Sequence, residues 1–389
     1  MSRSLVSIPL VAAVTILATT CTSEGAWDTI RRQQALVSQN LIWRQRVPLT
    51  LDNSFPASDE LVDFPVLILL DDSNIDMDLF APGGRDIRFH AEPIAGRMPH
   101  EMPALPHEVE HWDPAGVSAV WVRVPRIPAG SPDTRIWLYL DNPTATDRQR
   151  PTDVWSNGYV GVWHLNEADP PYRDSGPNGL HGTSEVNGFT TPERVAGPSY
   201  GYAQDFRASP TPDRGIVIPA HPAVGDLGPL TLSFWFQLEA VVNGARFFHK
   251  GPMELWISNS HPEFAVGHSG PKLFRSFTNP WSLGSWQHFA VRWDGEPDPA
   301  GVSLYRDGQL FDTVFNSGTP TDERTSDASK DLIIGNVSFG PPPERPTPGI
   351  VSSVQLSSVV RSSGWIRATH RGFNGSFVSI GAPEAVQYR

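Results

Sequence analysis

The chain has 389 residues, of which 39% are apolar and 19% charged, with 38 prolines and 33 glycines. A proline share near twice the usual ~5% excludes a helical bundle or a coiled coil, and 10% aromatic residues exclude global disorder. The net charge of −12, without a stripe rich in Lys or Arg, argues against a nucleic-acid partner.

The N-terminal segment is typical of an export signal. Arg3 precedes an apolar run over 5–17, and small residues separate that run from Cys21. The run is too short to span a bilayer, which takes about 20 residues. Because Cys21 is the only cysteine, an internal disulfide and a cysteine-based zinc site are excluded. We predict a signal peptide over 1–20 and an anchor or linker over 21–44.

The position of Cys21 resembles that of the acylated cysteine of a bacterial lipoprotein. This resemblance implies an exported protein that reaches the membrane through a lipid on Cys21, at the outer membrane or the cell surface. The usual lipobox has Leu three residues before the cysteine and Gly, Ala or Ser directly before it, whereas this chain has Ala18 and Thr20. An ordinary secretory signal with an incidental cysteine is the alternative.

Two series of short runs, rich in β-branched and aromatic residues, follow one another along the rest of the chain. Each run is bounded by Pro, Gly, Asp or Asn, as strands are. The first series predicts an all-β sandwich over 45–150, and the second an antiparallel jelly roll over 151–389. Asp307-Gly308 predicts a tight hairpin, because both turn positions need positive φ. The runs are 47–52, 64–71, 86–90, 119–125 and 135–142, then 158–165, 231–238, 254–258, 286–293, 302–314 and 331–337.

Motifs in these segments carry two further resemblances. The first segment is similar to a bacterial domain family of unknown function that commonly precedes lectin-like jelly rolls. The second resembles a LamG-like jelly roll of the concanavalin A type, which implies the same all-β fold and a ligand-binding role. The motifs are LTLDN (49–53), GGRDIRF (83–89) and IWLYLDNP (136–143) in the first segment, and RDSGPNGLHG (173–182), GSWQHFAVRWDG (284–295) and SGWIRATHRGFNGSF (363–377) in the second.

His107-Glu108-Val109-Glu110-His111 formally matches the HExxH signature of zinc peptidases. That signature needs a helix, in which the two histidines lie one turn apart. Prolines at 103, 106 and 114 leave no room for one. In a strand the two histidines would lie ~13 Å apart, so we predict a polar strand without zinc.

Two other catalytic motifs lack the context that their chemistry requires. Ser199 lies in a formal GxSxG sequence, but no helical pattern follows it, as a nucleophile elbow would need. Glucanases of the concanavalin A type use two Glu and an Asp on one strand. The only near match, Glu167-Ala168-Asp169, is ended by Pro170. We therefore predict that the protein is not an enzyme.

The candidate ligand contacts are few. Trp281 and Trp112 lie outside apolar strands and are expected to be exposed, and His249 ends a strand. Calcium is the expected cofactor, with Asp174 in a Gly/Asn-rich turn as first ligand and Asp205 as second. An Asx turn is the alternative role for Asp174. The acidic pair that the LamG-like family usually carries is replaced here by IVSSVQLSS (350–358), so a calcium role for that pair does not transfer.

These observations predict a noncatalytic binding or adhesion protein of the bacterial cell envelope. Its partner would be a glycan or an envelope protein recognised by the jelly roll, with the first domain as a spacer or partner module. The alternatives are a polysaccharide-active hydrolase, which would need two carboxyl groups in a cleft, and a passive structural component of the envelope.

Overall fold

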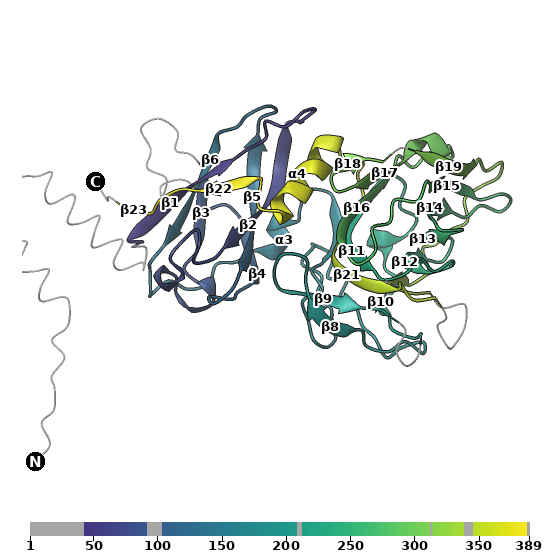
Figure 1. Cartoon of the computed structure of the whole chain (residues 1–389), viewed down its shortest axis with the longest axis horizontal. Coiled ribbons are helices and arrows are strands. Elements are labelled where there is room, and N and C mark those ends of the chain that lie inside the picture. The colour runs from purple at the N-terminus through teal and green to yellow at the C-terminus, as the bar shows by residue number, and fades with distance from the viewer. Residues whose placement is uncertain (1–42, 92–102, 208–211, 312, 338–344, 387–389) are drawn as a thin grey trace, which may run out of the picture.

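The computed structural model describes residues 43–91, 103–207, 212–311, 313–337 and 345–386. Cys21 and the predicted signal peptide lie outside these ranges. Strands dominate the described elements, and all the pairs between named strands are antiparallel, which confirms the predicted fold class (Figure 1). Asp307 and Gly308 both have positive φ between two paired strands, as the hairpin prediction requires.

The first domain is a sandwich of two sheets around one hydrophobic core. In β1 every second residue is buried, with Val47, Leu49 and Leu51 fully inside, because successive side chains of a strand point to opposite faces. One sheet contains β1 (Gln45–Leu51), β3 (Arg88–Ala91) and β6 (Thr134–Leu140), and the other β2 (Leu61–Leu70), β4 (His107–His111) and β5 (Ser118–Ile127).

The jelly roll consists of an eight-stranded and a seven-stranded sheet, with a core rich in phenylalanine between them. The eight-stranded sheet contains β7 (Tyr159–Trp163), β8 (Glu193–Ala196), β9 (Tyr202–Asp205), β11 (Leu230–Leu238), β16 (Trp286–Trp293), β17 (Val302–Arg306), β18 (Gln309–Leu310) and β21 (Gly349–Ser357). The seven-stranded sheet contains β10 (Ile216–Ile218), β12 (Arg246–Lys250), β13 (Met253–Ser258), β14 (His261–Val266), β15 (Leu273–Phe277), β19 (Val314–Gly318) and β20 (Leu332–Ile334).

The last strands of the chain return to the first domain. β22 (Val378–Ile380) and β23 (Glu384–Ala385) both pair with β1 (Figure 1). The segment predicted as the jelly roll, 151–389, includes these strands, whereas their pairing places them in the first sheet. The jelly roll is therefore an insertion between two strands of the first domain.

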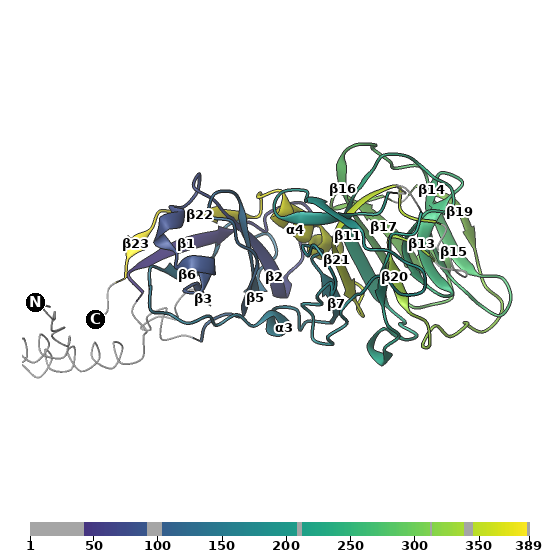
Figure 2. The same ribbon diagram turned by 90° about the horizontal axis from the view of Figure 1, so that it is seen from below.

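The two domains meet at helix α4 (Ser363–Phe373), which lies between the two sandwiches (Figures 1 and 2). The Oγ atom of Ser362 accepts a hydrogen bond from the Trp365 amide at 3.1 Å and caps the helix. Trp365 packs on Phe64 of β2, with 4.7 Å between ring centroids. The rings of Trp235, on the eight-stranded sheet, and Phe373 lie 5.2 Å apart. One continuous core thus includes side chains of both domains.

A shorter helix, α3 (Pro151–Val154), joins the first domain to β7.

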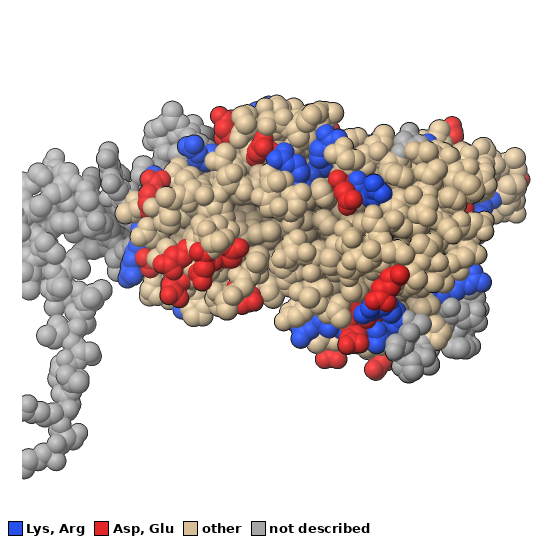
Figure 3. All heavy atoms as spheres, viewed as in Figure 1, with Lys and Arg blue, Asp and Glu red and all other residues tan. Residues whose placement is uncertain are grey.

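In the space-filling view, acidic side chains gather on the visible face of the first domain (Figure 3). Basic and acidic side chains are interspersed on the visible face of the jelly roll, where no extended basic patch appears.

Candidate functional site

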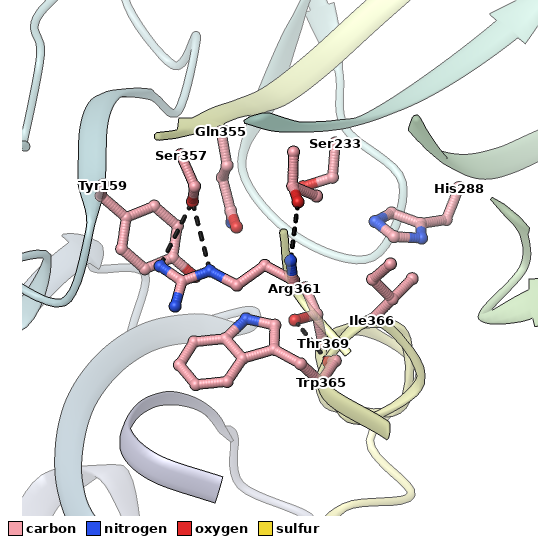
Figure 4. Close-up of a pocket in the computed structure, with 10 residues that line it drawn as sticks. Tyr159, Ser233, His288, Gln355, Ser357, Arg361, Trp365, Ile366 and Thr369 are labelled. Carbon is pink, nitrogen blue, oxygen red and sulfur yellow. Dashed lines mark hydrogen bonds between the residues drawn. The ribbon is translucent and has the colours of Figure 1, made fainter. Parts of the chain in front are cut away.

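The outer face of the eight-stranded sheet is covered by α4 and the first domain. The space left beneath α4 is a cavity of about 10 Å³, which is room for about one water molecule. Arg361 fills most of this space: its guanidinium lies 4.1 Å from the centroid of Trp365 and 4.6 Å from that of Tyr159 (Figure 4). The part of this sheet face beneath α4 therefore has no room for a large ligand.

The outer face of the seven-stranded sheet is the alternative surface of the jelly roll. In β13 the residues Leu255 and Ile257 are buried in the core, so Glu254 and Trp256 point outward. Trp256 is directly opposite Glu263 of β14, which is opposite Ser276 of β15, and cross-strand partners share a face. We call this surface the Trp256 face, defined by Arg246, Glu254, Trp256, Glu263, Lys272, Phe274 and Ser276.

The indole of Trp256 is half-buried and fixed by charged neighbours. The guanidinium of Arg246 lies 4.3 Å from its ring centroid, and the ammonium group of Lys272 lies 5.0 Å from it. The indole Nε1 donates to Glu263 Oε1 at 3.2 Å. The ring is thus held in one orientation by cation–π contacts and a hydrogen bond.

Two carboxylates of the Trp256 face lie on either side of Lys272. Its Nζ atom is 2.9 Å from Glu263 Oε1 and 4.0 Å from Glu254 Oε1. Ser276 donates to the second oxygen of Glu263 at 2.6 Å, and Arg246 Nη2 donates to Glu254 Oε2 at 3.0 Å. Both carboxylates are therefore already engaged by side chains of the protein.

Two of the three predicted ligand contacts are less accessible than expected. The ring of Trp281 is half-buried, stacks on Phe289 with 5.5 Å between centroids, and donates to the Ser260 carbonyl at 2.8 Å. Trp112 is also half-buried and packs against Phe80 at 5.4 Å. Both indoles are half-buried rather than exposed, because aromatic side chains of the cores lie beneath them, and a ligand contact at either residue stays a prediction.

His249, the third predicted contact, lies next to the Trp256 face. It is directly opposite Glu254 in the register of β12 and β13. The residue is only 7% exposed, and burial, together with the charge of Arg246, lowers the pKa of its imidazole to about 4. His249 therefore supports this part of the sheet as a neutral, buried side chain, and a direct contact with a ligand stays a prediction.

The two predicted calcium ligands have partners within the protein. Asp174 accepts hydrogen bonds from the amides of Val162, Gly176 and Leu180 at 2.7–2.8 Å, so its carboxylate organises the turn. Asp205 forms an ion pair with Arg207 at 2.6 Å. Within the described ranges, no group of three or more His, Cys, Asp or Glu side chains is arranged to hold a metal ion. Calcium binding at Asp174 and Asp205 stays a prediction.

The His107–His111 segment is strand β4, so the helix that a zinc peptidase requires is not present there. Its glutamates instead surround His164 of the jelly roll. His164 Nε2 lies 3.3 Å from Glu108 Oε2, and His164 Nδ1 lies 3.2 Å from Glu110 Oε2. The sequence pattern does not reveal this arrangement, because the histidine is more than 50 positions away from both carboxylates.

Further donors surround both glutamates. Glu108 accepts from Trp155 Nε1 at 2.7 Å and from Ser175 Oγ at 2.5 Å. Glu110 accepts at 2.5–2.8 Å from Trp121 Nε1, Tyr200 Oη and Asn166 Nδ2. We call Glu108, Glu110 and His164 the interdomain triad, since it joins the first domain to the jelly roll.

The charges of the interdomain triad stabilise one another. Burial alone would lower the pKa of His164, but the carboxylates of Glu110 and Glu108 outweigh it and raise that pKa to about 9. Burial would raise the pKa of Glu108, yet the imidazolium and the hydrogen bonds hold it below its ordinary value. At neutral pH the histidine is a cation with a donor on each nitrogen.

No helix of the described residues has the length and apolar character needed to cross a membrane. A comparison with curated proteins gives no match for the chain.

Several solved structures resemble part of the chain. The binding domain of Paraclostridial Mosquitocidal Protein 1 has 10% identity and a TM-score of 0.42, over 56% of this chain and 53% of that one. The binding domain of botulinum neurotoxin serotype C1 has 9% identity and a TM-score of 0.41, over 56% and 52%. The match to these two binding domains thus spans about half of their length. Domain 4 of the extracellular arabinanase AbnA from Geobacillus stearothermophilus, solved in complex with arabinotriose, has 18% identity and a TM-score of 0.36, over 54% and 96%.

Family models match one segment in each of the two domains. Residues 83–160 match a domain of unknown function (DUF2341), and residues 211–367 match the concanavalin A-like lectin/glucanases superfamily. Both resemblances stated from the sequence are thereby confirmed, in the predicted order. Residues 211–367 are thus identified by their match to the concanavalin A-like lectin/glucanases superfamily, and residues 83–160 by their match to a domain of unknown function.

Proposed function

We propose that the protein is an exported, noncatalytic binding or adhesion protein of the cell envelope, whose jelly roll recognises a glycan through the Trp256 face. The observation that carries this proposal is the contrast between the two sheets. One outer face is covered by α4 and the first domain, whereas the other presents Trp256 between charged side chains.

The chemistry of the Trp256 face suits a glycan. The part of the Trp256 indole that stays exposed beside Arg246 and Lys272 offers an apolar surface at low conformational cost, on which the carbon–hydrogen face of a sugar ring can pack. Around it, the half-buried Glu254 can accept hydrogen bonds from hydroxyl groups, and Lys272 can donate to them. Because Arg246, Lys272 and Glu263 already hold the indole, little side-chain freedom is lost on binding.

Replacing Trp256 tests this proposal directly. We expect Trp256→Ala to weaken glycan binding about thirtyfold, as loss of a central aromatic contact does at binding sites, and Trp256→Phe to retain most of the affinity. Screening on a glycan array, followed by calorimetry with the best ligand, measures both effects.

Leu283→Ala, at a residue 52% exposed and outside this face, is the matched control and should bind as the unchanged protein does. Equal affinity of Trp256→Ala and the unchanged protein for every glycan bound would contradict the proposal. Silence on the array, combined with Trp256-dependent binding to an isolated envelope protein, would replace the glycan by a protein ligand.

A polysaccharide-active hydrolase is the second candidate, favoured by the position of Glu254 and Glu263 around one ammonium group. Such an enzyme needs one carboxyl group that carries a proton at working pH. Here both carboxylates already bind side chains of the protein, Glu263 with Lys272 and Ser276 and Glu254 with Arg246. We therefore expect no release of reducing ends from any polysaccharide that the protein binds. Release that disappears in Glu263→Gln would establish the hydrolase instead.

We also propose that a lipid on Cys21 attaches the protein to the membrane. Cys21→Ala is then expected to move the protein from the membrane fraction to the soluble fraction, because one acyl-bearing residue would supply the anchor. Fractionation followed by immunodetection measures the shift. Unchanged membrane association of the variant would leave an ordinary secretory signal as the better explanation.

A further inference from the structure

A second polar cavity lies outside the Trp256 face, where the two domains meet. Its volume is about 430 Å³, within the range of sites that hold small ligands. Glu108 and Glu110 of β4 line it from the first domain, and Asn166, Glu167 and Arg173 from the jelly roll. Both domains are therefore needed to form its wall.

The deep part of this cavity is already satisfied by internal contacts. His164 and the surrounding hydrogen-bond donors engage both carboxylates of the interdomain triad, and Asp174 accepts from three backbone amides. These groups form a rigid, polar wall. Ligand contacts with unused capacity must therefore come from elsewhere in the lining.

The rest of the lining offers one acceptor without a hydrogen-bond partner, which is buried, and two donors on exposed side chains. Glu167 Oε1 accepts from the Arg173 amide at 2.9 Å, whereas Glu167 Oε2 is shielded from solvent and has no hydrogen-bond partner. The guanidinium of Arg173 is exposed, and among the described residues it forms no ion pair. His181 Nδ1 accepts from the Asp174 amide at 3.0 Å, so in the neutral ring Nε2 carries the hydrogen and is a donor.

We propose that this cavity binds a neutral, hydroxyl-rich ligand: a single sugar unit. A hydroxyl group both donates and accepts, so it can meet Glu167 Oε2 and the donors of Arg173 and His181 together. An anionic ligand would face the carboxylates of Glu108, Glu110 and Glu167. A cationic ligand would face Arg173 and the imidazolium of His164, and of the four carboxylates in the lining Glu108, Glu110 and Asp174 are already engaged by partners within the protein.

This site is separate from the glycan surface proposed above, since it shares no residue with the Trp256 face and includes part of the first domain. A sugar bound here would touch both domains at once. Its affinity should therefore depend on rim residues of the cavity and be independent of Trp256.

The experiment titrates the full-length protein with glucose, galactose and mannose, and with glucuronate and putrescine as charged probes, by saturation-transfer NMR and calorimetry. We expect a neutral sugar to bind, and Arg173→Ala and Glu167→Gln each to weaken it at least about tenfold. Glu167→Gln keeps the acceptor for the Arg173 amide and replaces the unused acceptor by a donor. Arg135→Ala, an exposed arginine on β6, is the matched control.

Trp256→Ala separates the two sites, because it should leave sugar binding in the cavity unchanged even where glycan binding to the sheet is lost. The inference is overturned if no neutral sugar binds at high millimolar concentration. It is also overturned if both rim variants bind as well as the unchanged protein, if only a charged probe binds, or if Trp256→Ala removes all sugar binding.

Discussion

Raising the pH from 6.5 to 9 is expected to lower the free energy of unfolding by about 3 kcal/mol through His164 alone. The pKa of this histidine is raised from 6.5 to about 9 by the carboxylates of the interdomain triad. Below pH 6.5 the imidazole is charged in both the folded and the unfolded chain, so its stabilising effect is fully present. Between the two pKa values only the folded chain holds the proton, and stability falls as pH rises.

Urea unfolding measured at several pH values across this window tests the prediction. In His164→Gln the decline should be absent, and the variant should already be less stable than the unchanged protein at pH 6.5. His288→Gln is the matched control at another buried histidine. Burial lowers the pKa of His288 to about 3, so this imidazole is neutral above pH 6.5 and its loss should leave the alkaline decline in place. An unchanged decline in His164→Gln would assign it to another group.

Removing the ring of Phe373 should cost about 3–5 kcal/mol, the usual loss when a buried Phe is truncated to Ala. Phe373 is 2% exposed, and its ring lies 5.7 Å from Trp121 of the first domain and 5.2 Å from Trp235 of the jelly roll. The cavity left by Phe373→Ala would therefore open in the core that joins the two domains. We expect the domains of the unchanged protein to unfold together and those of the variant to unfold separately.

Urea unfolding followed by tryptophan fluorescence and by circular dichroism measures both effects. Leu310→Ala is the control, since Leu310 is 50% exposed and its truncation should change stability by no more than about 0.5 kcal/mol. A loss below about 1 kcal/mol in Phe373→Ala, with coincident transitions, would show that the contact between the domains does not depend on this ring.

Local sequence pattern predicted the fold class because strands and turns leave local signals. The alternating sequence ELWIS (254–258) also indicated the candidate surface, since Trp256 points to the side of the strand opposite the buried Leu255 and Ile257. A tryptophan among the outward-facing, polar positions of a strand is the sequence signal for this surface.

The remaining features depend on partners far apart in the chain. β22 and β23 are short and mostly exposed, and their partner β1 lies at the opposite end of the described chain. The role of Glu108 likewise appears only once His164 and Ser175 are placed beside it. The partial burial of Trp281 also depends on distant partners, because its loop sequence does not reveal the phenylalanines on which the ring packs.

The insertion of the jelly roll into the first sheet has a mechanical consequence. The chain enters the jelly roll after β6 and leaves it before β22, and both strands flank β1. A pull on a ligand held by the jelly roll is thus divided between two covalent connections and passes to β1 from both sides. Because β1 and β22 are antiparallel, tension between the N-terminal end of β1 and the start of β22 would shear their hydrogen bonds together. The end of β6 lies opposite the N-terminal end of β1, so tension through that second connection would separate the pairs of β1 and β6 one by one.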